Sequence, residues 1–252
     1  IPGLGSLALA IGYTCVMGLI FKYTFLAFDG GLSAMGQDMD GIVATFNATA
    51  SAWGANVWVV VAVAVSFVIM SFGIAGGIEK ANKIMMPILF LLFVGLGIYV
   101  ATLPGASDGY RYIFTIKPAG LLDPYVWIYA FGQAFFSLSV GMGGMAIFGS
   151  YIGKDHALMG ESLRVIFLDT FVAVLAGIII FPACFTYGLE VTAGPSLLFD
   201  TMAGVFGNMA GGRWWGALFF LFMVFAALST VLGVCENILA MAVSYTHLRA
   251  HE

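Results

Sequence analysis

Six apolar segments, each long enough to cross a lipid bilayer, dominate this sequence. A transmembrane helix needs about 20 predominantly apolar residues, and the segments that meet this length lie at about 2–28, 53–73, 84–102, 124–153, 163–188 and 213–243. An open sheet edge has no hydrogen-bond partners in lipid, so such segments are expected to be helical. The sequence therefore predicts an all-α transmembrane protein with about six spans.

The scarcity of charged residues supports this fold class. Charged residues make up 9% of the 252 residues and hydrophobic residues 62%, whereas a soluble domain has about 25% charged residues. So few charges do not cover the surface of a soluble protein, and the solvent around most of this chain is expected to be lipid. Because the basic residues are scattered and the net charge is −4, nucleic acid is not an expected partner.

The ends of the sequence favour a piece of a longer multi-pass protein of the plasma (inner) membrane. The sequence begins at Ile1, without a methionine or a basic leader. Residues 1–243 are interpreted as part of a transmembrane domain. Residues 244–252 are interpreted as a non-native tail that resembles translated adapter sequence, with an ordinary polar loop as the alternative. Loops 74–83 and 154–164 hold four basic residues against three in the other loops, which favours a cytoplasmic start.

The fourth span is expected to be broken near the middle of the membrane. Gly141, Gly143 and Gly144 follow Ser137 and Ser139, and each glycine costs a helix about 1 kcal/mol relative to alanine. An unwound backbone at membrane depth is tolerated only where it is buried in protein or lines a cavity, and such breaks are typical of the binding sites of secondary transporters. The alternative is close helix packing through small residues.

Four further polar residues lie inside apolar spans. Ser229 and Thr230 are adjacent in the sixth span, where their hydroxyls either bond to carbonyls of their own helix or supply oxygen ligands to Na+. Asp169 lies in the fifth span and Glu236 in the sixth. Carboxylates inside a membrane are functional candidates, and the alternative is that each lies near an interface and is solvated.

Three stretches together resemble the neurotransmitter:sodium symporter family, in particular its bacterial branch with the LeuT-type fold. They are residues 76–87, 132–143 and 225–230, of which 132–143 is the most specific. The resemblance covers residues 1 to about 243 and implies family helices three to eight. It therefore implies a partial inverted-repeat bundle that carries about half of a binding site, because helix one of the family supplies several sodium ligands and most substrate contacts.

The resemblance assigns roles to individual residues. The positions that match the substrate pocket of the family are Tyr13, Phe136, Ser139, Met142 and Val234. Those that match sodium ligands are Ser137 and Asp169 at the first site, and the Ala226 carbonyl, Ser229 and Thr230 at the second. Those that match the surroundings of the chloride site are Gln133 and Ser137. Those that match gating or unwinding positions are Gly77 and Pro87, as a Gly-x9-Pro element, and Gly141, Gly143 and Gly144.

One departure from the family pattern concerns the first sodium site. Asp169 stands where the family usually has asparagine, which implies a fixed negative charge beside sodium; a reduced need for chloride is one consequence that the sequence does not decide. Taken by itself, the interval from Gly77 to Pro87 reads as an ordinary loop followed by a proline in the first turn of a helix. Only the resemblance makes it an element that unwinds.

The resemblance implies a transporter and not an enzyme. The expected activity is symport of Na+ and an amino acid or related small amine by alternating access, with two sodium sites in the complete protein and chloride as a further candidate ion. The lipid bilayer is the other expected partner. One alternative is a proton-coupled transporter of the same fold, in which Asp169 or Glu236 carries the proton. Another is a membrane receptor or scaffold that does not transport.

Overall fold

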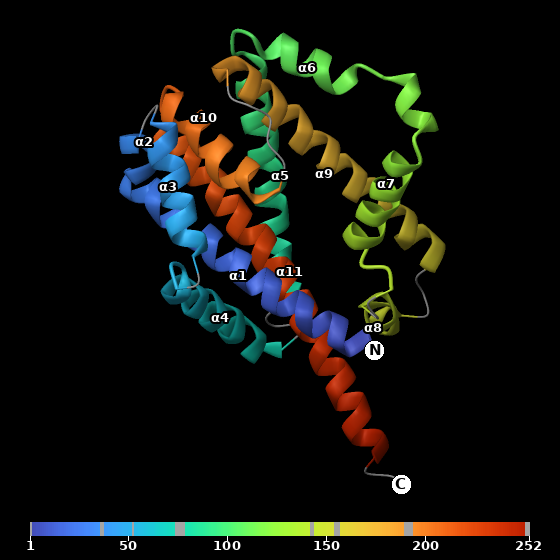
Figure 1. Cartoon of the computed structure of the whole chain (residues 1–252). Helices are drawn as coiled ribbons and strands as arrows, with labels where there is room; N and C mark the ends of the chain where they lie inside the picture. The colour runs from blue at the N-terminus through green and yellow to red at the C-terminus, as the bar shows by residue number, and fades with distance from the viewer. Residues whose placement is uncertain are drawn as a thin grey trace. The chain divides into compact units, whose positions relative to one another are not determined.

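The computed structural model describes residues 2–35, 38–51, 53–73, 79–141, 144–153, 157–188 and 194–249 (Figure 1). Within these ranges the chain forms helices joined by short turns, and no strand occurs. The chain divides into two compact units. Gly12–Phe114 and Leu175–Leu232 form one, which we call the hairpin unit, and Ile1–Ile11, Thr115–Val174 and Gly233–Glu252 form the other, which we call the broken-helix unit.

Each of the six predicted spans contains helix in its described residues, and the fourth contains two helices with a break between them. Among the described residues, four helices are long and apolar enough to cross a membrane by themselves. They are α1 (Pro2–Asp29), α5 (Glu79–Ala101), α9 (Leu158–Tyr187) and α11 (Gly212–Arg249). Helix α4 (Asn56–Ser71) is apolar but shorter. Many large apolar side chains are exposed, including Leu91 on α5 and Phe167 on α9, as expected for surfaces that face lipid.

The predicted fourth span is divided into two short helices. Helix α7 (Pro124–Ser137) ends before the glycine-rich stretch, and α8 (Gly144–Tyr151) begins after it. The start of α7 follows from its sequence, because Pro124 occupies the first turn and the Asp123 side chain accepts a hydrogen bond from the Tyr125 amide at 2.9 Å. The break predicted for the fourth span is therefore confirmed.

Pro87 lies inside α5 and not in its first turn. The helix begins at Glu79, so the interpretation of Pro87 as a first-turn proline is wrong. A proline in a helix interior removes one backbone hydrogen bond and clashes with the carbonyl four residues earlier, which weakens the helix at that point. Gly77, the other end of the predicted unwinding element, lies outside the described residues.

The connections between the spans contain helices that the sequence pattern did not predict. In the hairpin unit these are α2 (Gly31–Met35), α3 (Met39–Ala50), α6 (Ala106–Phe114), a π-helical turn η3 (Leu197–Thr201) and α10 (Met202–Asn208). The broken-helix unit contains the 3-10 helix η2 (Pro118–Leu122). Asp38 caps α3 by accepting a hydrogen bond from the Gly41 amide at 3.0 Å, which satisfies one of the free donors at that helix end.

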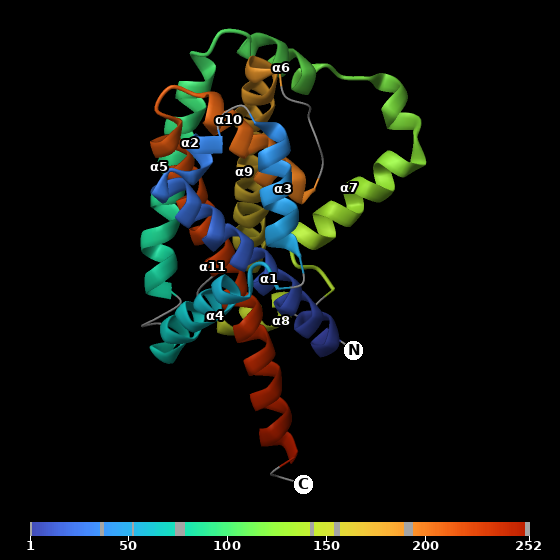
Figure 2. The ribbon, with the colours of Figure 1, turned by 60° about the vertical axis from the view of Figure 1, so that its left-hand side comes forward.

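Helices α2 and α3 pack against η3 and α10 (Figures 1 and 2). The connection between α1 and α4 and the connection between α9 and α11 therefore meet within the hairpin unit.

Aromatic rings and a close helix contact hold the hairpin unit together. The Tyr23 ring lies 4.8 Å from the Phe199 ring and 5.5 Å from the Phe220 ring, measured between centroids. Helix α1 approaches α4 so closely at Gly18 that an added Cβ would lie 2.4 Å from Cγ2 of Val59. Such close packing through a small residue is a usual way to join helices in a membrane.

Candidate functional site

The end of α7 has an uncommon backbone geometry. The Ser139 amide donates to the Phe136 carbonyl at 3.1 Å, and the Val140 amide donates to the Phe135 carbonyl at 2.9 Å. This pair of bonds is a Schellman motif, which ends a helix with one residue in the left-handed conformation. Glycine usually occupies that position, but here Ser139 holds it with a φ of 54°.

The chain stays irregular after Ser139. Gly141 has a φ of 90°, which is inexpensive only for glycine. Left-handed residues other than glycine are costly and cluster at functional sites. The predicted site positions Met142 and Gly143 lie outside the described residues, and Gly144 is buried at the start of α8. The break in the fourth span thus coincides with a strained backbone at a residue that the sequence assigns to the substrate pocket.

This geometry makes Ser139 sensitive to one kind of substitution. A residue with a Cβ pays about 1–2 kcal/mol in the left-handed conformation, and glycine does not. We expect Ser139→Gly to raise the thermal stability of a full-length transporter that contains this chain, by about 1 kcal/mol at most, because glycine also loses more entropy on folding. Ser139→Ala is the matched control and should bring no gain. Equal stability of the two variants in a thermal unfolding assay would contradict a left-handed Ser139.

The structure brings together the two residues assigned to the first sodium site. The Ser137 hydroxyl donates a hydrogen bond to Oδ1 of Asp169, which joins the last residue of α7 to the middle of α9 within the broken-helix unit. Asp169 is half-buried and Ser137 is exposed. A carboxylate and a hydroxyl beside a broken helix are oxygen ligands of the kind that hard cations prefer.

The residues assigned to the second sodium site lie one turn apart on α11. The Thr230 hydroxyl donates to the Ala226 carbonyl at 3.0 Å, and the adjacent Ser229 is half-buried. Both possibilities raised for these hydroxyls remain compatible with this contact, because the bond within the helix also holds two oxygens on one face of it. These residues belong to the hairpin unit, whereas Ser137 and Asp169 belong to the broken-helix unit.

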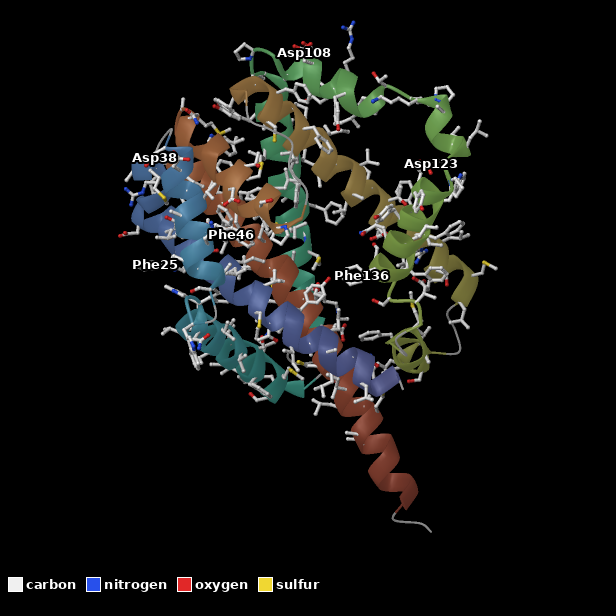
Figure 3. All side chains as sticks on the ribbon, in the orientation of Figure 1. Phe25, Asp38, Phe46, Asp108, Asp123 and Phe136 are labelled. Atoms are coloured by element: carbon white, nitrogen blue, oxygen red, sulfur yellow. The ribbon has the colours of Figure 1, made fainter. Side chains whose placement is uncertain are left out.

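The remaining predicted site residues are distributed over both units. Phe136 (Figure 3) and Gln133 are exposed on α7, and Val234 is half-buried on α11, all three in the broken-helix unit. Tyr13 is half-buried on α1 in the hairpin unit. The structure therefore groups the first sodium pair with most of the pocket positions, and places Tyr13 and the second sodium set in the other unit.

Two contacts of α11 were not predicted from the sequence. The Tyr151 hydroxyl donates to Oε1 of Glu236 at 2.8 Å, so this carboxylate has a specific partner. The buried Asn237 amide donates to the Ser6 hydroxyl at 3.0 Å. Both contacts join residues that are far apart in the sequence, and the only sequence signal was the presence of polar residues in apolar spans. In the described part of the chain no group of three or more His, Cys, Asp or Glu could hold a metal ion.

Comparisons with known proteins agree with this architecture. The model of a family described as the sodium:neurotransmitter symporter family matches residues 41–251. An uncharacterized sodium-dependent transporter of Haemophilus influenzae is 39% identical over 178 residues, which are 70% of this chain and 38% of that protein. The uncharacterized sodium-dependent transporter YhdH of Bacillus subtilis is 31% identical over 230 residues, which are 90% of this chain and 50% of that protein.

A solved structure matches most of the chain. The crystal structure of MhsT in complex with L-phenylalanine superposes with a TM-score of 0.81 at 35% sequence identity, and the match covers 94% of this chain and 53% of MhsT. This likeness confirms the predicted helical bundle of the LeuT type. The chain spans about half of MhsT and half or less of these two relatives.

Proposed function

The chain belongs to the sodium:neurotransmitter symporter family, and from that premise we propose that it forms part of a sodium-coupled importer of an amino acid in the plasma membrane. The family is one of multi-pass membrane transporters and not of enzymes. The contact between Ser137 and Asp169 at the break between α7 and α8 carries the proposal. It supplies two oxygen atoms at a place where the backbone is already unwound.

The proposed first sodium site uses this pair directly. When Na+ is bound, the Ser137 hydroxyl oxygen and the Asp169 carboxylate act as ligands, and the freed carbonyls of the broken helix are further oxygen donors. At a separation of 4 Å, two opposite unit charges attract each other by about 4 kcal/mol at an effective dielectric constant of about 20. The charge of Asp169 is therefore expected to dominate the affinity of this site for sodium.

The charge of Asp169 also affects the expected dependence of transport on chloride. We propose that Asp169 provides the negative charge that chloride would provide if the residue were an asparagine, so that transport by this protein does not require chloride. Gln133 and Ser137 remain the candidate chloride contacts, and they are expected to bind the anion in a variant that lacks the Asp169 carboxylate. Asp169 and Ser137 form their hydrogen bond within one unit, which supports a direct link between the two sites.

The amino-acid substrate is proposed from the solved relative. MhsT was crystallised with L-phenylalanine, and we propose that the substrate pocket of this protein includes the positions that the family resemblance assigns to it, namely Tyr13, Phe136, Ser139, Met142 and Val234. Binding of Na+ and substrate then biases the equilibrium between outward-open and inward-open states by their difference in affinity for the two. Pro87 inside α5 supports a helix that unwinds toward one side of the membrane.

The test is uptake of a panel of labelled amino acids into proteoliposomes that contain a full-length transporter with this chain. Sodium-gradient-driven accumulation of one or a few amino acids is the expected result. Accumulation driven by a pH gradient without Na+ would instead favour proton coupling through Asp169 or Glu236. Binding without accumulation under either gradient would favour a receptor and would contradict the proposal.

A double substitution tests the second sodium site. Replacing both Ser229 and Thr230 with alanine removes two hydroxyl ligands and leaves the Ala226 carbonyl without its bond from Thr230. We expect the sodium concentration for half-maximal uptake to rise at least roughly tenfold, which corresponds to about 1.4 kcal/mol. Ser66→Ala is the control, because Ser66 is a buried serine that bonds to a carbonyl of its own helix in α4. An unchanged sodium dependence in the double variant would remove the second-site assignment.

A further inference from the structure

Among the described residues of the hairpin unit, four buried polar side-chain atoms have no hydrogen-bond partner, and two of them belong to a pair of residues that interact electrostatically. One is Oδ1 of Asp200, in the π-helical turn η3, and the other is the Tyr23 hydroxyl on α1. The exposed fraction is 8% for Asp200 and 0% for Tyr23. Buried polar groups without a partner are rare in native proteins and call for an explanation, and π-helical turns are often found at functional sites.

Asp200 follows Phe199, whose ring belongs to an aromatic cluster. The Phe199 ring lies 4.8 Å from the Tyr23 ring and 5.7 Å from the Phe46 ring of α3, measured between centroids, and Figure 3 labels Phe46 on α3. The Phe220 ring of α11 lies 5.5 Å from Tyr23. Asp200 also interacts electrostatically with Tyr23. Asp200 is therefore a buried carboxyl group that directly follows a ring of an aromatic cluster, and Tyr23 of that cluster is its electrostatic neighbour.

The charged groups of the neighbouring elements are engaged elsewhere or exposed. On α11, the Arg213 guanidinium donates to the Phe28 carbonyl at 2.6 Å. On α1, the Lys22 ammonium points to the Gly54 carbonyl at 3.5 Å, and Asp29 is exposed, as is Asp40 on α3. Helices α2 and α10 contain no titratable residue. No described cation thus compensates a charge on Asp200.

An ionised carboxylate in such a place is unfavourable. The effective cost of burying an unpaired ion is several kcal/mol, and a carboxyl group avoids it by keeping its proton. Burial raises the pKa of Asp200 above its ordinary value for this reason. A neutral carboxyl group can both donate and accept a hydrogen bond, so it is a chemically suitable partner for a tyrosine hydroxyl such as that of Tyr23.

We propose that Asp200 is a proton-binding site, and that its neutral form docks the η3–α10 segment against α1 and α3. We call the η3–α10 segment, residues 197–208, the latch, and it is docked when Asp200 holds a proton. This inference concerns a residue outside the proposed sodium and substrate positions and does not depend on the proposed function. In the predicted topology the latch faces the outside of the cell, so its proton would come from the external medium.

The direction of the pH dependence follows from the direction of the shift. The docked segment holds its proton to a higher pH than the undocked segment, so the docked state binds more protons in the interval between the two pKa values. Docking is fully stabilised below the ordinary carboxyl pKa of 3.8, and this stabilisation is lost as the pH rises through the raised pKa. Above the raised pKa the segment is held less tightly.

Hydrogen exchange tests the proposal in a full-length transporter containing this chain, in nanodiscs over a series of pH values. After correction for the intrinsic exchange rate, the amides of residues 197–208 should lose protection as the pH rises. In Asp200→Asn, which mimics the neutral carboxyl, protection should be high and independent of pH. Asp40→Asn is the matched control and should behave like the wild type. A pH-independent wild type, or the same pH dependence in Asp200→Asn, would overturn the proposal.

An infrared measurement covers the case in which Asp200→Asn does not fold. The carbonyl stretch of a buried protonated carboxyl group should appear in the wild type at mildly acidic pH and disappear as the pH rises. Tyr23→Phe should shift this band, because it removes the hydroxyl partner. A spectrum without such a band throughout the acidic range, as expected if a cation from another helix pairs with Asp200, would show that the residue stays ionised and would overturn the proposal.

Discussion

Replacing Asp169 with alanine is expected to abolish sodium-driven uptake by a full-length transporter that contains this chain. The substitution removes the carboxylate that accepts the hydrogen bond from Ser137 and, with it, the only charged ligand proposed for the first sodium site. A loss of about 4 kcal/mol, the attraction of two unit charges at 4 Å, corresponds to roughly a thousandfold loss in sodium affinity. The loss in sodium affinity is measured from the uptake of a labelled amino acid as a function of sodium concentration.

Asp169→Asn separates the effect of charge from the effect of shape. The amide oxygen still coordinates sodium, but the fixed charge is gone. We expect this variant to transport when chloride is present and to lose transport when chloride is replaced by gluconate, whereas the wild type should be indifferent to this replacement. Asp40→Asn, at an exposed carboxylate of α3, should change neither dependence. Sodium affinity that is unaltered in Asp169→Ala would disprove the assignment of this residue.

Replacing Gly18 with leucine is expected to have the largest effect on stability. Its Cβ would lie 2.4 Å from Cγ2 and 3.0 Å from the backbone nitrogen of Val59, so α1 and α4 must separate. Overpacking of this kind typically costs about 1–3 kcal/mol and occasionally more, and here backbone atoms block the relief. Thermal unfolding in detergent should show a clear fall in the midpoint temperature.

A second glycine of α1 provides the control for this prediction. An added Cβ at Gly12 has no neighbour within 4 Å, so Gly12→Leu should leave the midpoint nearly unchanged. The double variant with Gly18→Ala and Val59→Ala should have a higher midpoint temperature than Gly18→Ala alone. The second substitution removes the contact with Cγ2 of Val59 but leaves the contact with the Val59 backbone. Equal midpoints for Gly18→Leu and Gly12→Leu would show that α1 and α4 do not pack as closely as described.

The sequence predicted the helices that lipid requires. Segments of about 20 apolar residues have few alternatives to a helix in a membrane, so the positions of α1, α5, α9 and α11 followed from hydropathy alone. The start of α7 was also predictable, because Asp123 and Pro124 carry a local signal. The glycines at 141, 143 and 144 indicated the break after α7 for an equally local reason.

Other features depend on contacts between distant residues and left no local signal. The polar connections gave no sign that α3 and α10 would pack together, because their apolar residues are interspersed with glycine and polar residues. No pattern in the sequence indicated that Asp200 would be buried, or that Phe199 beside it would pack on rings from α1, α3 and α11. The left-handed Ser139 was unexpected because glycine normally fills that position. The assignments of single residues to sodium and substrate remain predictions.

The packing of α2 and α3 on η3 and α10 also constrains the order in which the protein can be made. The ribosome releases α3 early, but its partner emerges only after α4, α5, α7, α8 and α9 have been synthesised, at about 5–20 residues per second. During that interval Phe46 lacks the Phe199 ring on which it stacks, and Tyr23 lacks both of its aromatic neighbours. The nascent chain therefore displays unburied rings until the connection that carries η3 and α10 has been synthesised, and a chaperone or insertase that binds aromatic side chains can bind it during that interval.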